Sequence, residues 1–356
     1  MVSANASADI EINTSPAVRW WLYALCLLIF AMIIVGGATR LTDSGLSITE
    51  WKPILGIIPP LNDIDWQDAF AKYKQIPEYR LVNKGMSLAE FKFIFWWEWA
   101  HRFLGRMIGF AFLLPFLFFW LTGRIEKGLI SKLIVMFVLG GLQGALGWYM
   151  VASGLVDRVD VSQYRLAAHL SAAILIIGYI FWVALSLRPA RAGPSEAGRG
   201  LVLSAVGLTA LVFLQIALGA FVAGLDAGMG YNTWPLMDGA LVPGGLGAMA
   251  PWYANLFENA LTVQFNHRVA AYAVLVWTLL HTWRVIMRAG EGPFAVSAGV
   301  MTLAVLLQVG LGIWTLLAQV PVGLALLHQG GAVLVLAIAL IHLHQLARAQ
   351  GGILMA

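Results

Sequence analysis

Long apolar stretches with almost no charge recur along this chain of 356 residues. They cover residues 20–38, 107–123, 133–156, 166–187, 200–225, 269–283 and 292–347, and Gln319, Val320 and Pro321 divide the last stretch into two. A helix of about 20 apolar residues crosses a bilayer, and its backbone groups are all paired within the helix. The pattern therefore predicts an all-α integral membrane protein with eight transmembrane helices.

The composition agrees with lipid as the solvent. Apolar residues make up 60% of the chain and charged residues 11%, and the mean hydropathy is +0.81, whereas soluble domains carry about 25% charged residues. The net charge of +4 comes from basic residues at predicted helix ends, so membrane orientation explains it and nucleic acid is not expected as a partner. Cys26 is the only cysteine, which excludes a disulfide and a covalent Cys-x-x-Cys-His heme attachment.

Charges in the loops predict the orientation. The links after the second, fourth and sixth predicted helices carry the basic residues Arg124, Lys127 and Lys132; Arg188, Arg191 and Arg199; and Arg284 and Arg288. The link between the third and fourth helices balances Arg158 and Arg165 with Asp157 and Asp160, and the link between the last two has no charge. The positive-inside rule then places both termini and the basic links in the cytoplasm.

Two further segments lie outside the predicted helices. The first 18 residues carry Asp9 and Glu11 and no arginine, as in a short tail rather than a transit peptide. Residues 40–100 form a long outer loop, in which residues 66–76 space their apolar positions as an amphipathic helix does. We predict a cap on the outer surface there, and a flexible tether is the alternative.

The two halves of the chain share motifs in the same order. Residues 37–46 resemble 221–229, 50–53 resemble 233–235, 98–102 resemble 264–268, 143–147 match 308–312, and 168–173 match 327–332. Because each half has an even number of helices, both halves cross the membrane in the same direction, as a parallel repeat. We predict two tandem four-helix bundles, one in residues 1–190 with the long outer loop and one in residues 198–356.

Four of the seven histidines occupy matched places. His101 and His267 lie at the start of the second helix of each half, and His169 and His328 lie near the start of the fourth. All four are therefore expected in the outer leaflet. Ionisable residues inside a membrane span are costly and are functional candidates, although a neutral imidazole that ties two helices together is the alternative. Heme iron accepts an imidazole on each side of the ring, whereas zinc needs more ligands than each pair supplies.

The other three histidines, His281, His342 and His344, are expected near the cytoplasmic surface. His281 and His342 each follow a matched histidine by 14 positions, which is about 21 Å along a helix.

Residues beside the matched histidines leave two interpretations open. Arg102 and Arg268 directly follow two of them and can pair with heme propionates or extend to lipid headgroups. The small residues at 171–173 and 330–332 give room for a flat ligand, or serve close helix packing.

One matched position differs in chemistry between the halves. Glu98 lies one turn before His101, whereas Gln264, which cannot titrate, lies one turn before His267. A carboxyl group beside a bound ring can exchange a proton during an oxidation; the alternative is an exposed i,i+4 ion pair with Arg102. We predict that the first half is the reactive one and that the second half holds a permanent heme.

Four segments together resemble the heme A synthase family, in the form found in proteobacteria and mitochondria. They are GGATRLTDSGLS at residues 36–47, EWKP at 50–53, EFKFI at 90–94 and EWAHRFLGR at 98–106, and the resemblance extends over all eight predicted helices. It implies the conversion of heme O to heme A, the prosthetic group of terminal cytochrome oxidases. In that reaction a ring methyl group is oxidised to a formyl group by removal of four electrons, through an alcohol and a gem-diol.

The same resemblance implies roles for individual residues. His267 and His328 would ligate a resident heme b, His101 and His169 would face the heme O substrate, and Glu98 would be the essential carboxylate. Some bacterial members have paired cysteines in the outer loops, which this chain lacks. The expected partners are heme O, membrane lipid, heme O synthase, cytochrome oxidase assembly and an electron donor or acceptor, and a homo-oligomer is compatible with them. The expected location is the bacterial inner membrane, with the heme sites toward the outer face.

Two other functions fit parts of the pattern. A di-heme b-type membrane cytochrome that exchanges electrons with quinone would use the four histidines equally well, and the contrast between Glu98 and Gln264 distinguishes the enzyme from it. A permease with parallel repeats would show no heme absorbance.

Overall fold

The computed structural model describes residues 14–52, 55–156, 158–188 and 198–350, and within these ranges it is helical with no strand. Eight helices are long and apolar enough to cross a membrane: α1 (Pro16–Leu41), α4 (Leu88–Leu121), α5 (Lys127–Ala152), α6 (Gln163–Ser186), α7 (Arg199–Gly224), α8 (Ala260–Ala289), α9 (Pro293–Leu317) and α10 (Val322–Ala349). The shorter helices are η1 (Leu55–Ile57), α2 (Asp63–Tyr73), α3 (Pro77–Leu81), η2 (Ala227–Met229) and η3 (Trp252–Leu256). The prediction of an all-α, multi-pass membrane protein with eight spans is confirmed.

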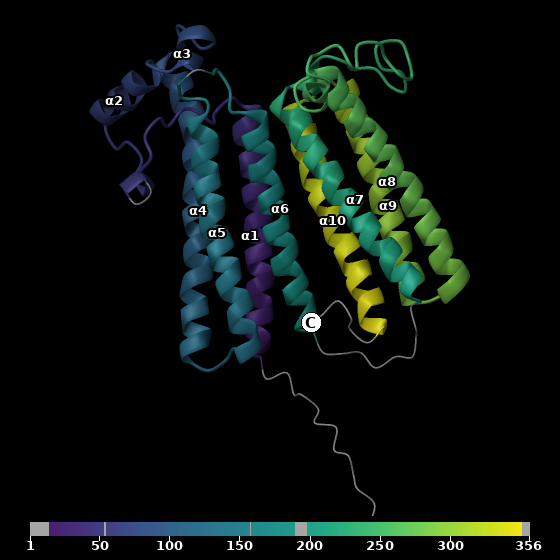
Figure 1. Cartoon of the computed structure of the whole chain (residues 1–356). Helices are drawn as coiled ribbons and strands as arrows, with labels where there is room; N and C mark the ends of the chain where they lie inside the picture. Colours follow the sequence, from purple (N-terminus) through teal and green to yellow (C-terminus); the bar gives the residue numbers. More distant parts are fainter. Residues whose placement is uncertain (1–13, 53–54, 157, 189–197, 351–356) are drawn as a thin grey trace, which may run out of the picture.

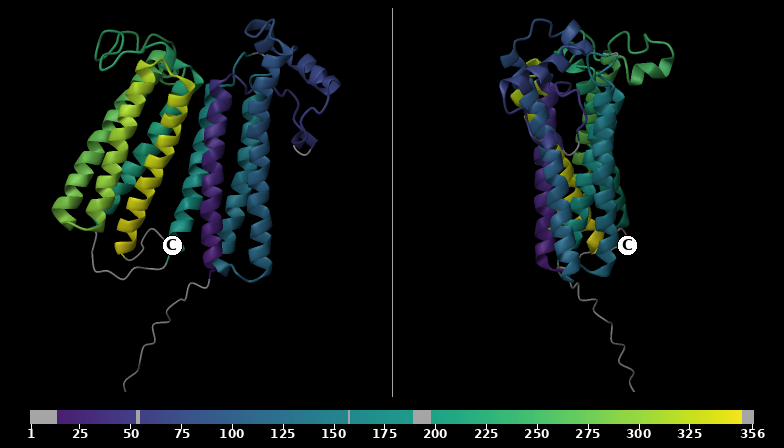
Figure 2. Two further views of the ribbon diagram at one scale, coloured as in Figure 1. Left: turned by 180° about the vertical axis from the view of Figure 1, so that it is seen from behind. Right: turned by 90° about the vertical axis from the view of Figure 1, so that its left-hand side faces the viewer.

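The spans stand in two groups, with α1, α4, α5 and α6 in one and α7 to α10 in the other (Figures 1 and 2). One cluster of buried apolar side chains runs through both groups. Between them, the Gln329 amide of α10 donates a 2.7 Å hydrogen bond to the Ile33 carbonyl of α1. The predicted boundary between domains falls on residues 189–197, including Arg191, which lie outside the described residues, as do Asp157, Pro53, Asp9 and Glu11. The division into two domains stays a prediction.

Helix α4 begins far before the apolar run that predicted it. Ser87 and Glu90 form a capping box, in which the Ser87 side chain accepts from the Glu90 backbone N–H and the Glu90 carboxylate accepts from the Ser87 N–H at 2.7 Å. Hydropathy alone missed this segment because it contains Glu98 and Arg102. His101 therefore lies well inside a 34-residue helix and not at its start.

A cap made of α2 and α3 covers the beginning of α4 (Figure 1). Trp66, Phe70 and Tyr73 of α2 are buried against Phe91 and Phe95 of α4. The ring centroids of Phe70 and Phe91 are 4.9 Å apart, in a stacked arrangement. The predicted amphipathic helix over residues 66–76 is confirmed in the main, and it packs on α4 rather than forming a flexible tether. We call this end of the molecule the cap end.

The cap buries a carboxyl group, that of Glu78 in α3. The side chain is 5% exposed, and its Oε2 has no hydrogen-bond partner in the part of the chain that the structure describes. Burial, together with the negative charges of Asp43 and Glu98, raises the pKa of Glu78 to about 8. The group is therefore protonated in the folded cap at neutral pH.

This burial predicts a pH-dependent stability. Between the ordinary pKa of 4.5 and the folded pKa of about 8, only the folded state keeps the Glu78 proton, so stability falls as the pH rises through this window. In Glu78→Gln the decline should be smaller, because the amide cannot ionise. The measurement is the melting temperature of the purified protein at pH 5 to 9, with the exposed Asp63→Asn as control. The same slope in Glu78→Gln as in the unaltered protein would contradict the assignment.

Candidate functional site

Each of the four matched histidines packs against a glycine on the preceding membrane-spanning helix. A Cβ atom added at that glycine would lie 2.8 to 3.0 Å from the ring atom Cε1, which is tighter than at least nine in ten real Cβ contacts, so the ring would have to give way. The pairs are Gly36–His101 at 2.8 Å, Gly147–His169 at 3.0 Å, Gly219–His267 at 3.0 Å and Gly312–His328 at 2.8 Å. The absence of a side chain at these four glycines is what allows a backbone to approach each ring so closely.

Three of these histidines also contact a glutamine, four positions before the glycine. The amide nitrogen of the glutamine lies near Nδ1 of the ring and near the backbone carbonyl oxygen of the same histidine. The distances to these two atoms are 3.1 and 2.9 Å for Gln143 and His169, 3.1 and 3.0 Å for Gln215 and His267, and 3.1 and 2.8 Å for Gln308 and His328. The amide nitrogen donates, so these contacts belong to the imidazole with its proton on Nε2. A histidine that binds a metal through Nε2 carries its proton on Nδ1, and the glutamine would then support the ring by turning its amide oxygen to that N–H.

Sequence reasoning used two of these glutamines only to align the repeat and overlooked Gln215. The signal that would have found all three is the shared spacing Gln-x-x-x-Gly.

The rings of the pair in the second half are separated as two ligands of one metal ion are. The ring centroids of His267 and His328 are 6.4 Å apart and the rings are nearly perpendicular, at 84°. Two imidazoles on opposite sides of one iron would have centroids about 6 Å apart, given metal–nitrogen bonds of about 2 Å. The described rings of His101 and His169 make no contact of this kind. The residues of the second half therefore fit a bis-histidine heme.

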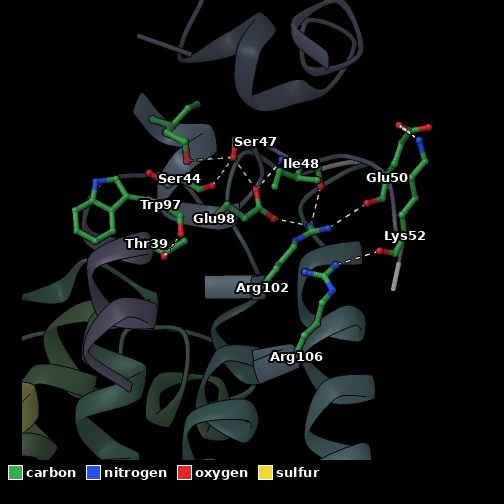
Figure 3. A network of polar contacts seen from close by, with 11 residues as sticks. Thr39, Ser44, Ser47, Ile48, Glu50, Lys52, Trp97, Glu98, Arg102 and Arg106 are labelled. Atoms are coloured by element: carbon green, nitrogen blue, oxygen red, sulfur yellow. Dashed lines mark hydrogen bonds and ion pairs between the residues drawn. The ribbon is translucent and has the colours of Figure 1, made fainter. Parts of the chain in front are cut away.

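Glu98 is buried at the cap end of α4, where donors reach both of its carboxylate oxygens (Figure 3). Oε2 accepts from the Ser47 hydroxyl at 2.8 Å and from the Ile48 backbone N–H at 2.6 Å, and Oε1 accepts from Arg102 at 2.5 Å. The predicted i,i+4 pair with Arg102 is thus present. It is not the exposed pair of the alternative interpretation, because Glu98 is only 2% exposed.

The two arginines tie the helices to the loops above them. Arg102 donates to the carbonyls of Ile48 and Glu50, at 2.7 and 3.0 Å. These bonds hold the guanidinium against the loop, so it does not extend freely to lipid headgroups.

Arg268 repeats this arrangement in the second half. It donates to the carbonyls of Tyr231 and Thr233 at 2.7 and 2.8 Å, and to Gln264 Oε1 at 2.9 Å. Its Nε is buried and has no hydrogen-bond partner among the described residues. This nitrogen is a donor suited to an anionic group such as a heme propionate.

The comparisons with known proteins agree on one family. A family described as "Cytochrome oxidase assembly protein" matches residues 19–340. Heme A synthase of Parvibaculum lavamentivorans is 54% identical over 332 residues, which are 93% of this chain and 95% of the relative. Heme A synthase of Chelativorans is 56% identical over 91% of this chain and 90% of the relative, and that of Azorhizobium caulinodans is 53% identical over 98% and 99%. The chain belongs to the heme A synthase family. The resemblance inferred from the four sequence segments is confirmed.

In this member of the heme A synthase family, the small residues after His328 serve helix packing. A Cβ atom at Gly330 would meet Ile34 and Phe30 of α1, and one at Gly331 would contact Gln308. Gly330 and Gly331 thus allow close packing, and room for a flat ligand at residues 171–173 and 330–332 stays a prediction.

The three histidines expected near the cytoplasmic surface are buried: His344 of α10 packs on Trp182 of α6, and the other two lie inside the second group of helices. His281 and His342 are each 1% exposed, and their Nε2 atoms are 2.9 Å apart. Ser204 lies 2.9 Å from His281 Nδ1, and Ser297 lies 2.7 Å from His342 Nδ1. The chain of hydrogen bonds joins α7, α8, α10 and α9. Spacing along one helix gave no sign of this pairing, because it depends on which helices face each other.

The close approach of glycine to histidine predicts the effect of a single added side chain. Gly312→Val should displace the His328 ring and weaken heme retention at least about tenfold, as loss of support for a ligand does. Gly310→Val is the matched control. Gly310 lies on the same helix as Gly312, but a Cβ atom there would meet nothing within 4 Å. The measurement is heme absorbance per chain after purification. Equal heme content in the two variants would show that the contact has no role in holding heme.

Proposed function

We propose that this protein oxidises the ring methyl group of heme O to a formyl group, giving heme A for cytochrome oxidase assembly, and that a heme b is its resident cofactor. The observation that carries the proposal is a chemical difference between two networks that are built around corresponding arginines. In each, an arginine donates to two loop carbonyls and to the side chain one turn before it. That side chain is the carboxylate of Glu98 in the first half and the amide of Gln264 in the second.

The second half is suited to a cofactor that stays bound. His267 and His328 would hold the heme b iron, and Gln215 and Gln308 fix the two rings from outside. Arg268, with its unpaired Nε, would hold a propionate. When bound, such a heme supplies one-electron transfer.

The first half is suited to the reaction. His101 and His169 would face heme O, with Arg102 as the cationic group beside it. Conversion of a methyl to a formyl group removes four electrons and adds one oxygen atom, so it needs an external electron donor or acceptor. Glu98 lies one turn from His101 and is held in place by Ser47 and Arg102. Its carboxylate would take up and release the protons of the reaction.

The placement in the cell follows from loop charges and the family. We propose the bacterial inner membrane, with both termini in the cytoplasm and the cap end, where α4, α6, α8 and α10 begin, facing outward (Figure 1). Heme O synthase would deliver the substrate, and the oxidase assembly machinery would take the product.

Glu98→Gln tests the proposal. The amide keeps the size of the side chain and its bond to Arg102 but cannot carry a proton, so heme A formation from heme O should fall at least about 100-fold. The heme spectrum of the purified protein should stay unchanged. Glu126→Gln, at the opposite end of the α4–α5 hairpin, controls for the loss of one carboxylate. Unchanged heme A formation in Glu98→Gln would contradict the assigned role.

Pigment analysis of cells separates the enzyme from a di-heme cytochrome. Cells without the protein should accumulate heme O and lack heme A. Normal heme A in those cells would favour electron transfer to or from quinone instead.

A further inference from the structure

Three membrane-spanning helices carry the same six-residue pattern, and a fourth keeps only its glycine. The pattern Leu-Gln-x-x-Leu-Gly occurs at residues 142–147 of α5, 214–219 of α7 and 307–312 of α9. At the corresponding place, α1 has residues 31–36, Ala-Met-Ile-Ile-Val-Gly. The glycine that faces the histidine is kept as Gly36, but Met32 stands where the other three helices have glutamine.

This change leaves one histidine without the support that the other three have. His169, His267 and His328 each receive a glutamine amide at Nδ1 and at their own carbonyl oxygen. By contrast, Nδ1 of His101 is buried with no hydrogen-bond partner in the described parts of the chain.

Met32 stands at the position of the glutamine but cannot form its hydrogen bonds. Its Cε lies beside α4, 3.1 Å from where a Cβ of Gly105 would be, one turn after His101. A thioether has no donor and is only a weak acceptor. The methionine therefore packs along the helix without fixing the imidazole, and the side-chain torsions of His101 are restricted only by packing.

We propose that His101 is the histidine of the first heme site that detaches from the heme iron. Met32 allows this because it gives the ring no hydrogen bond. The three glutamines are positioning residues: when an iron holds Nε2 and the proton lies on Nδ1, the amide oxygen can accept from Nδ1–H and keep His169, His267 and His328 aimed at their ligand. This proposal rests on the proposed function, in which the first half must bind a substrate and let its product go while the second half retains a cofactor. A histidine that no side chain fixes can turn toward the iron when heme arrives and away when it leaves.

The partners on the other side of each site agree with this assignment. His169, which would face the same substrate as His101, is held by Gln143, so the first site has one fixed and one free side. Both histidines of the second site contact a glutamine, and of the two matched pairs only this one makes a ring contact among the described residues. The first site, which would release its heme, has one glutamine-supported histidine, and the second site, which would retain its heme, has two.

The test is the rate at which heme leaves the protein for an excess of apoglobin. Full-length Glu98→Gln protein, which should not turn over, is loaded with heme O, and the transfer is followed by absorbance. We expect a fast phase from the first site and a slow phase from the second. Adding Met32→Gln should slow the fast phase about tenfold, the effect of one support for a metal ligand. Met32→Leu keeps the apolar shape without an amide, and should leave the fast phase unchanged.

The reverse exchange gives a second, independent variant. Gln215→Met should speed the slow phase about tenfold and leave the fast phase as it was. The spin state of the heme is a separate readout, because a histidine that leaves the iron converts a six-coordinate heme to a five-coordinate one.

The outcomes distinguish this proposal from the proposed function. An unchanged fast phase in Met32→Gln, or equal slowing by Met32→Leu, would overturn the role of Met32 while leaving the enzyme assignment intact. Absence of any fast phase in the parent protein would mean that the first half binds no releasable heme, and both proposals would fail.

Discussion

The close contact between a histidine ring and a glycine of the neighbouring helix is the interaction on which the rest of this structure depends. A polar ring is costly inside lipid unless the bundle surrounds it and pairs its nitrogens. Glycine provides the space, since a single Cβ at Gly219 or Gly312 would meet the ring at 3.0 Å or less. Because the same contact occurs in four helix pairs, it determines where the helices meet and where two imidazoles can face one ligand.

Two side chains next to this common contact separate the halves chemically. Under the proposed function, Glu98 in place of glutamine gives the first half a group that can exchange protons, and Met32 in place of glutamine leaves that half a histidine without side-chain support. Few side chains would then separate a site that holds heme from one that processes it.

The features that could be predicted are those encoded by patterns that extend over many residues. Apolar runs gave the eight spans, and ordered motifs gave the four histidines and the contrast between Glu98 and Gln264. The start of α4 was missed because its capping box at Ser87 precedes a stretch that includes charged residues. The pairing of His281 with His342 could not be predicted, because spacing gives the position along a helix but not the partner across the bundle. Gln215 was overlooked, although it shares the spacing Gln-x-x-x-Gly with the other two glutamines.

The most direct test of the central claim is the heme content of protein purified from cells that make heme b but no heme O. The account predicts one six-coordinate, bis-histidine heme b per chain. His267→Ala and His328→Ala should each lose this spectrum, and His101→Ala should keep it. Loss of the resident heme in His101→Ala, with its retention in His267→Ala, would contradict the assignment of the cofactor to the second half.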